Sequence, residues 1–367
     1  MTLPCLTRRA WLGSTALALA GCGVPSITAV PPRLRLIGHT TLPHRLNFRD
    51  TIVGGLSAID FDPASGAWIA LCDERAERDP ARFYTLAVTL LPDALRVQPT
   101  GVVALRQANG QPYGRRQVDP EAARLLPGGN LLWTSEGDVT LGLPPSMHES
   151  RPDGSLVRDI AMPAHLRVDG GAGPGPRNNL TLEGLALTPG RRGAWAAMEG
   201  PLQQDGPEPS VAAAGGPCRF THFDLASGKA TRQIAYVPDA IPAAPIPPGA
   251  YADNGVSEIL MDGEHHLLVL ERAFMMGRGV SLRLYRIDLR EASDTLASPQ
   301  LLRGRFRAPR KTLLADFAQL GLPRLDNTEG MCWGPRLANG SRSLVFVSDD
   351  NFNPMQVTQF VACEYLE

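Results

Sequence analysis

A strand–turn–strand unit bordered by polar and acidic residues recurs five times in the 367-residue chain. Each copy has a polar or acidic residue, an apolar run, a turn containing glycine, a second apolar run and then an acidic residue. The copies begin at Gly54, Asp119, Asn179, Asn254 and Asp326. A repeat constrains the fold more strongly than any single motif, because every copy must adopt similar local structure.

The polar residues that border each unit keep a similar separation along the chain. The pairs are Ser57 and Asp73, Glu121 and Glu136, Glu183 and Glu199, Glu258 and Glu271, and Glu329 and Asp349, separated by 16, 15, 16, 13 and 20 residues. In an antiparallel hairpin, the start of the first strand lies beside the end of the second. We therefore expect both polar residues of each unit at the same end of its strand pair.

Further alternating segments between the copies, such as residues 82–90 and 218–237, also indicate strands. Four antiparallel strands repeated about an axis form a β-propeller, whose inner strands line a central channel. The sequence predicts an all-β propeller of five four-stranded repeats. Units of about 65 residues exceed a typical blade of ~40–50, so we expect either inserted loops or a sixth, degenerate blade. We expect residues 356–367 to pair with residues 32–42 and close the ring.

The N-terminal segment has the pattern of an export signal. Arg8 and Arg9 precede an apolar stretch at residues 10–20, and small residues lead to Cys22. The segment resembles a twin-arginine signal with a bacterial lipobox, in which Cys22 is lipidated after cleavage. An ordinary cleaved signal is the alternative.

These features predict the domain organisation and the location of the protein. We expect a signal peptide with a lipobox at residues 1–22, a linker at 23–33 and the propeller domain at 34–367. No later apolar run is long enough to span a bilayer. We therefore expect a periplasmic protein anchored to the bacterial membrane, at the outer membrane, through a lipid on Cys22.

The charge balance argues against a nucleic acid partner. Without Arg8 and Arg9, 34 basic residues face 37 acidic ones, and there is no basic block. Beyond Cys5 and Cys22, four cysteines remain, which do not match a zinc pattern and allow three disulfide pairings. They are Cys72, Cys218, Cys332 and Cys363.

If the repeat closes into a ring, its polar borders gather at one mouth. The gathered residues would be Ser57, Asp73, Glu136, Glu183, Glu199, Glu258, Glu271, Asn327, Glu329, Asp349, Asp350 and Asn351. So many carboxylates would raise one another's pKa values unless a cation compensated them. Ca²⁺ accepts six to eight oxygen ligands in flexible geometry. The alternative is that each acid caps its own hairpin or pairs with an arginine such as Arg75 or Arg272.

Roles follow for these residues as a hypothesis. The predicted ligands of a divalent cation are Glu183, Glu258, Glu329, Asp349 and Asn351. The predicted catalytic residues are Glu329, Asp349, Arg75 and Arg272, and the predicted substrate contacts are Ser57, Asp73, Glu199, Glu271, Asn327 and Asp350. A metal could polarise a phosphoryl or acyl oxygen and activate a water, while the two arginines orient an anionic substrate. The chain has no G-x-S-x-G motif, and a polar funnel role is favoured for Ser57 over a nucleophile.

Several blocks also resemble a known family. They are "GGLSAIDFD" at 54–62, "LTLEGLALTPGRRGAWAAMEGPLQQDG" at 180–206, "VSEILMDGEHHLLVLERAF" at 256–274, "RLYRIDL" at 283–289 and "DNTEGMCWGP…SLVFVSDDNF" at 326–352. From about Leu36 onward the chain resembles the bacterial phytase-like family, described as having "esterase-like activity of phytase". This resemblance implies an exported propeller that hydrolyses a phosphoester or an ester.

Two departures from the family pattern concern the first two units. Cys72 stands where a small polar residue is expected, and the unit around Glu121 is the least family-like. The contribution of that second unit to the ring is therefore in doubt.

Taken together, the sequence predicts a monomeric, lipid-anchored hydrolase that acts with Ca²⁺ on a small anionic phosphoester or ester. A dense basic lining suited to inositol hexaphosphate is not evident, which favours a smaller substrate. One alternative is a non-catalytic propeller that serves as a binding scaffold in the cell envelope. Another is a lactone hydrolase of the gluconolactonase type, which is similar only at "NTEGMCWG" and "SDDN".

Overall fold

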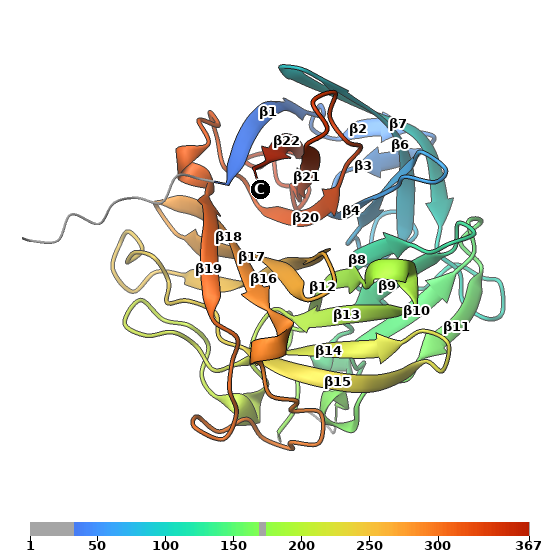
Figure 1. The fold of residues 1–367 in the computed structure, drawn as a ribbon. Helices are drawn as coiled ribbons and strands as arrows, with labels where there is room; N and C mark the ends of the chain where they lie inside the picture. Colours follow the sequence, from blue (N-terminus) through green and yellow to red (C-terminus); the bar gives the residue numbers. More distant parts are fainter. Residues whose placement is uncertain (1–32, 169–173, 367) are drawn as a thin grey trace, which may run out of the picture. The chain divides into compact units, whose positions relative to one another are not determined.

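The fold is an all-β, five-bladed propeller (Figure 1). A computed structural model describes residues 33–168 and 174–366. Within these residues, five sheets of four antiparallel strands form the blades, and a sixth blade is not found. The expected signal peptide, the lipidation site Cys22 and all of the linker except Arg33 lie outside the described residues. No helix in the described ranges is both long and apolar enough to cross a membrane.

The blades follow one another along the chain, and the first-named strand of each is the innermost. Blade 1 contains β4 (Leu56–Asp62), β5 (Ala67–Cys72), β6 (Arg82–Leu91) and β7 (Ala94–Ala104). Blade 2 contains β8 (Pro120–Leu125), β9 (Leu131–Ser135), β10 (Ser146–Ser150) and β11 (Leu156–Ile160). Blade 3 contains β12 (Leu182–Leu187), β13 (Gly193–Met198), β14 (Cys218–Asp224) and β15 (Lys229–Tyr236).

The last two blades and the short elements complete the fold. Blade 4 contains β16 (Ala252–Asp262), β17 (His266–Met275), β18 (Gly279–Asp288) and β19 (Lys311–Asp316). Blade 5 contains β20 (Thr328–Trp333), β21 (Arg342–Ser348), β22 (Gln359–Tyr365) and β1 (Leu34–Thr41). A hairpin of β2 (Leu46–Phe48) and β3 (Thr51–Val53) precedes blade 1. Short 3-10 helices lie at Val139–Leu141, Ala164–Leu166, Pro189–Arg191, Gln203–Asp205, Leu289–Glu291 and Phe317–Gln319.

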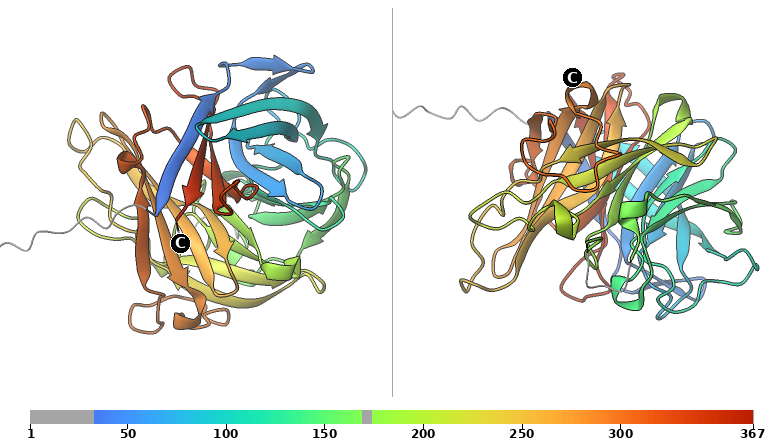
Figure 2. Two further views of the ribbon diagram at one scale, coloured as in Figure 1. Left: turned by 45° about the horizontal axis from the view of Figure 1, so that its top comes forward. Right: turned by 90° about the horizontal axis from the view of Figure 1, so that it is seen from below.

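The two ends of the described chain meet in blade 5. Strand β1 pairs antiparallel with β22, from Leu34 opposite Tyr365 to Thr41 opposite Gln359 (Figure 2). The expected closure is confirmed. It satisfies the backbone groups of β22, which would otherwise form an open sheet edge.

The core lies between neighbouring blades. Leu185, Trp195, Val256 and Ile259 of blades 3 and 4 belong to one buried cluster. The inner strands are apolar on both faces because each is covered by the two adjacent blades, so most of their residues do not alternate with polar ones. Polar residues nevertheless gather at one end of the inner strands, and these form the site.

Candidate functional site

A β-bulge in each innermost strand turns one residue out of the ladder. In blades 1, 3, 4 and 5 the extra residue lies between the paired residues on either side of it, and in blade 2 the irregular segment is Glu121-Ala122. A bulge re-aims the side chain of its extra residue. We call these residues the bulge positions: Ser57, Glu121, Glu183, Ser257 and Glu329.

A second ring of residues lies on the second strand of each blade, or directly after it, beside the bulged end of the inner strand. In blades 1, 2, 3 and 5 this residue directly follows the strand, and its backbone N–H donates to a carbonyl two residues before the bulge position. In blade 4 the strand continues, and Arg272 occupies this level opposite Gly255. We call these residues the strand-end positions: Asp73, Glu136, Glu199, Arg272 and Asp349.

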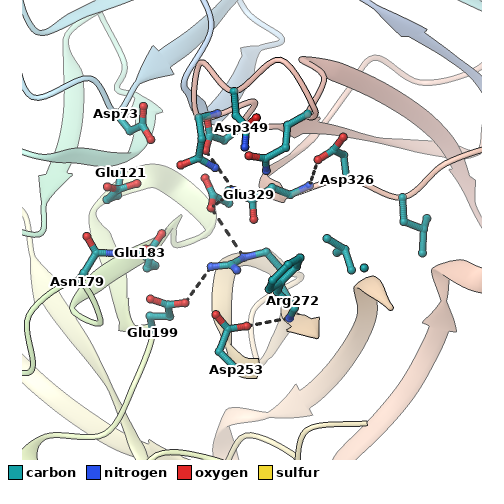
Figure 3. Close-up of a pocket in the computed structure, with 18 of the residues that line it drawn as sticks. Asp73, Glu121, Asn179, Glu183, Glu199, Asp253, Arg272, Asp326, Glu329 and Asp349 are labelled. Carbon is teal, nitrogen blue, oxygen red and sulfur yellow. Dashed lines mark hydrogen bonds and ion pairs between the residues drawn. The ribbon is translucent and has the colours of Figure 1, made fainter. Parts of the chain in front are cut away.

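Seven of these ten residues line a cavity of about 640 Å³, which we call the funnel pocket. In Figure 3 the side chains of Asp73, Glu121, Glu183, Glu199 and Glu329 surround a common space. The charged lining consists of Asp73, Asp119, Glu121, Glu183, Glu199, Asp253, Asp326, Glu329 and Asp349 with Arg75, Arg272 and Arg324. Nine carboxyl groups therefore face three guanidinium groups.

Three groups of carboxylates have the spacing that a bound cation requires. Within each group, one oxygen of every residue lies within 4.8 Å of the others. The groups are Asp73, Glu329 and Asp349; Asp119, Glu121 and Glu136; and Glu136, Glu183 and Glu199. Clustered carboxylate oxygens are the ligands that hard divalent cations prefer.

Burial and mutual repulsion raise the pKa values of these acids. The pKa of Glu183 lies well above its ordinary range, because burial and the charges of Glu199 and Glu136 oppose ionisation. The pKa values of Asp73, Glu121, Glu136 and Asp349 are also well above their ordinary range. Burial is the largest cause, and the charges of neighbouring carboxylates are the second. Within residues 33–168 and 174–366, these five acids form no ion pair within 4.0 Å.

Glu136 provides a separate indication of a missing ligand. Its Oε1 accepts the backbone N–H of Thr181, but its Oε2 is buried and has no hydrogen-bond donor among the described residues. An unpaired buried carboxylate oxygen is costly. Because Glu136 belongs to two of the three carboxylate groups, a cation there would satisfy that oxygen.

Arg272 is the exception among the strand-end positions. Its Nη2 donates to Glu199 Oε1 at 3.0 Å, and its Nε lies 3.8 Å from Glu329 Oε1 (Figure 3). Burial raises the pKa of Glu199 and of Glu329, Arg272 partly offsets this, and both values stand at about 7. Although burial alone would lower it, the pKa of Arg272 is raised by the same carboxylates.

Arg75 lines the same pocket as Arg272. Its Nη2 is 2.5 Å from Asp119 Oδ2 and 2.5 Å from Asn179 Oδ1. Burial raises the pKa of Asp119, Arg75 lowers it in part, and the value is about 6. Pairing with an arginine, the alternative to a metal site, therefore holds for Asp119, Glu199 and Glu329, but not for Asp73, Glu121, Glu136, Glu183 and Asp349.

Comparison with known proteins places the chain in a family. A family model for phytase-like proteins, with the description "esterase-like activity of phytase", matches residues 51–352. The chain belongs to the phytase-like family. A search of curated proteins finds no match.

Solved structures with a similar fold share little sequence with this phytase-like protein. An endo-arabinase from Bacteroides thetaiotaomicron VPI-5482 is 11% identical with a TM-score of 0.46, over 86% of this chain and 95% of that one. A periplasmic gluconolactonase from Pseudomonas aeruginosa is 12% identical with a TM-score of 0.35, over 87% of each chain. A glucose dehydrogenase is 11% identical with a TM-score of 0.38, over 89% of this chain and 98% of that one. Likenesses at these scores say nothing about the reaction.

The phytase-like protein brings nine of the expected site residues into the funnel pocket. They are Asp73, Arg75, Glu183, Glu199, Arg272, Asn327, Glu329, Asp349 and Asn351. The amide of Asn327 donates to Glu329 Oε1 at 2.8 Å and to Asp349 Oδ2 at 3.1 Å, which fixes both carboxylates. Their individual roles remain predictions.

Glu258, expected as a metal ligand, instead lies deeper on the axis. Its Oε2 accepts from Arg124 Nη2 at 2.7 Å, and its Oε1 accepts from the backbone N–H of Leu185 at 2.9 Å. Arg124 also donates to the carbonyls of Ile59, at 3.1 Å, and Met331, at 3.1 Å. These contacts reach all five inner strands, so the Arg124–Glu258 pair fills the centre of the ring.

The axial pair separates the funnel pocket from a smaller cavity of about 290 Å³. Arg124 and Asp60 line the smaller cavity, whereas neither lines the funnel pocket. Burial raises the pKa of Glu258 to about 7, with Arg124 opposing the shift. The placement of Glu258 at the mouth is thus corrected: it is the partner of a buried arginine.

Glu271, expected as a substrate contact, lies between blades 3 and 4. Its Oε1 is 2.6 Å from Lys311 Nζ and accepts from the Tyr236 hydroxyl at 2.6 Å. Its Oε2 accepts from Asn254 Nδ2 at 3.0 Å. With all these partners supplied by the protein, Glu271 holds two blades together and is not part of the pocket lining.

Ser57 and Asp350 are also held inside the fold and do not line the pocket. The Ser57 hydroxyl donates to the carbonyl of Pro120 at 3.3 Å, which links blades 1 and 2. Asp350 Oδ1 accepts from the backbone N–H of Gly55 at 2.9 Å and of Phe352 at 3.1 Å. Both side chains are therefore hydrogen-bonded within the fold and stabilise the inner strands without lining the pocket.

The errors in blade 4 have one cause. Ser257 is the bulge position and Arg272 the strand-end position, so the expected pair Glu258 and Glu271 is displaced by one residue at each end. A one-residue shift sends a side chain to the opposite side of a strand. The separation of 13 residues was the available signal, because Ser257 and Arg272 are 15 apart, like the pairs of other blades.

Blade 2 contributes more than the sequence predicted. Asp119 and Glu121 both line the pocket, and Glu136 completes their carboxylate group. The spacing of Glu121 and Glu136 already indicated this position. Asn179 and Asp326, the first residues of the third and fifth copies, also line the pocket together with Asp253, although none of the three was expected as a site residue.

Proposed function

We propose that this phytase-like protein is a metal-assisted hydrolase that cleaves a small anionic phosphoester or ester in the funnel pocket. The observation that supports the proposal is a set of five ring acids that form no ion pair within 4.0 Å in the described chain, one of which has an unsatisfied buried oxygen. Such an arrangement is costly unless the acids hold protons or a cation.

The residues fit a divalent cation, and Ca²⁺ suits them best. One group would be Asp73, Glu329 and Asp349, and the other Glu136, Glu183 and Glu199. All the donors are carboxylate oxygens, with the amides of Asn327 and Asn351 lining the same pocket. When bound, the cation would supply Lewis-acid polarisation of a phosphoryl or acyl oxygen.

The protein's own residues would bind and orient the substrate. Arg272 is held between Glu199 and Glu329, and its buried Nε has no hydrogen-bond acceptor among the described residues. A guanidinium commonly binds anionic oxygens, so Arg272 would orient an anionic group of the substrate. Arg75, whose side chain is partly exposed, would also contact the substrate.

Hydrolysis assays with and without cation test the proposal. We expect Ca²⁺-dependent cleavage of a simple phosphomonoester or carboxylic ester, abolished by chelation and by Glu329→Gln. Glu264→Gln, at an exposed turn residue, should change neither property. Turnover that survives both chelation and Glu329→Gln would refute the mechanism, and Ca²⁺ binding without any turnover would favour the scaffold alternative.

We also propose that the protein acts in the periplasm as a lipid-anchored monomer, without a nucleic acid partner. The pattern of Arg8, Arg9 and the segment ending at Cys22 supports export and lipidation. Cys22→Ala should release the protein from the membrane fraction, and membrane retention of that variant would refute the anchor.

A further inference from the structure

Blade 4 extends beyond the level of the two rings. Its first three strands have 11, 10 and 10 residues, whereas the inner strands of blades 2, 3 and 5 have six each. The added length pairs Ala252 with Met275 and Asp253 with Phe274, beyond Arg272. A ridge of sheet therefore rises beside the funnel pocket.

Apolar side chains of this ridge and of two loops of blade 5 line the pocket beside its charged residues. Tyr251 and Met355 have exposed fractions of 61% and 76%. We call the group the apolar wall: Tyr251, Phe274, Val280, Leu325 and Met355, all of which line the funnel pocket. Exposed apolar side chains that gather in a pocket mark a binding surface more often than those scattered singly.

The aromatic part of the wall is fixed in place although it is not buried. The rings of Tyr251 and Phe274 lie 6.2 Å apart, and the Tyr251 hydroxyl donates to Asp253 Oδ2 at 2.7 Å. Asp253 Oδ1 in turn accepts the backbone N–H of Phe274 at 2.8 Å. These bonds hold the wall in one arrangement without a core to pack against.

The wall lies next to the guanidinium that the proposed function assigns to the substrate anion. Phe274 and Arg272 are two residues apart in β17, so their side chains lie on the same face of the strand, and both line the pocket. A molecule that reaches Arg272 with an anionic group would cover Phe274 and Tyr251 with its adjacent part. A polyol carrying charge at every carbon would leave these side chains without an apolar partner.

From this juxtaposition we propose that the apolar wall binds an aryl-sized, apolar portion of the substrate, while its ester group faces Arg272 and the ring acids. The substrate class is therefore an ester or phosphoester of an aromatic or comparably apolar alcohol or acid. This inference depends on the proposed function for the identity of the reacting group. The binding of the apolar portion can be measured separately.

The test uses two phosphonates that cannot be hydrolysed, phenylphosphonate and methylphosphonate, with calorimetry in the presence of Ca²⁺. We expect phenylphosphonate to bind at least about tenfold more tightly, because it buries apolar surface that the methyl compound lacks. Tyr251→Ala should remove most of that preference and leave methylphosphonate binding unchanged. Met276→Ala is the matched control, since Met276 is 45% exposed on the same ridge but does not line the pocket.

Each outcome tests binding by the apolar wall separately from the proposed hydrolysis. Equal binding of the two phosphonates, or equal loss in Tyr251→Ala and Met276→Ala, would overturn the inference even if hydrolysis occurs. A phenyl preference that Tyr251→Ala removes would support it even if no ester is turned over, in which case only the proposed reaction fails. Circular dichroism of both variants shows whether their folding is intact.

Discussion

Two glycines allow the ring acids to approach the inner strands. A Cβ atom at Gly55 would lie 2.3 Å from Asp73 Oδ1, and one at Gly255 would lie 2.5 Å from Glu199 Cγ. Both glycines lie two residues before a bulge position, directly opposite a strand-end position. At these points the missing side chain makes room for a carboxylate.

Gly255→Ala tests this packing. Gly255 has no left-handed φ, so the added methyl group acts through contact with Glu199 and not through backbone strain. We expect Ca²⁺ affinity to fall about tenfold or more, measured by calorimetry, because Glu199 must move away from Glu136 and Glu183. Unchanged affinity in a folded variant would show that Glu199 is not a ligand.

A second substitution tests the axial pair. Glu258→Gln leaves Arg124 as an unpaired buried charge, which costs roughly 3–5 kcal/mol of unfolding free energy. Urea unfolding at pH 8, where Glu258 is ionised, should show this loss, and Glu264→Gln should not. The number of bound Ca²⁺ ions per folded molecule should stay the same, and a lower number would restore Glu258 as a metal ligand.

At the scale of strands, the repeated hairpins explain how much of the site the sequence revealed. A nearly constant separation between the polar borders predicted which strand ends meet, and it placed Asp73, Glu183, Glu199, Glu329 and Asp349 correctly in one pocket. The β-bulges could not be predicted, because an extra residue in a ladder leaves no compositional trace. Blade 4 shows the effect, since its register is one residue away from the acidic pattern.

The strand pairing that joins the chain ends was predictable for a different reason. An unpaired final strand is an edge liability, so the first and last strands had to meet. No comparable structural requirement predicted the position of the apolar wall. Tyr251 and Met355 lie in connecting segments outside the repeat, and their positions follow from the extended blade 4 and the loop after β21.

Removal of β1 should show how much the closure stabilises the ring. A chain that starts at Leu42 lacks the buried side chains of Leu34 and Ile37 and exposes the edge of β22. We expect a loss of at least about 4 kcal/mol and a tendency to self-associate, relative to a chain that starts at Arg33. Thermal unfolding and size-exclusion chromatography would reveal both, and equal melting temperatures would refute a stabilising closure.

At the scale of the whole molecule, the funnel acids link stability to pH and to cations. Burial raises the pKa values of Glu199 and Glu329 from an ordinary 4.5 to about 7, so the folded protein holds protons that the unfolded chain has released. This contribution to stability is complete below about pH 4 and is lost as the pH rises through about 7. A divalent cation bound to the ionised acids would take the place of the protons and prevent this loss of stability at high pH.

Melting temperatures measure this linkage. With chelator, we expect the protein to melt at a temperature higher by about 5 °C or more at pH 5 than at pH 8. With saturating Ca²⁺ the order should reverse, because the ionised acids then bind the cation. A cation-free protein that is more stable at pH 8 would show that the ring acids are compensated within the fold.

The Arg124–Glu258 pair has a consequence for traffic through the molecule. Because it fills the centre of the inner strands, it blocks the axial route among the described residues, so in the proposed reaction the substrate would enter and both products would leave by the mouth of the funnel pocket. A released anion would then pass the same arginines that the proposed function assigns to substrate binding. We therefore expect competitive product inhibition, with turnover paced by how fast that anion escapes.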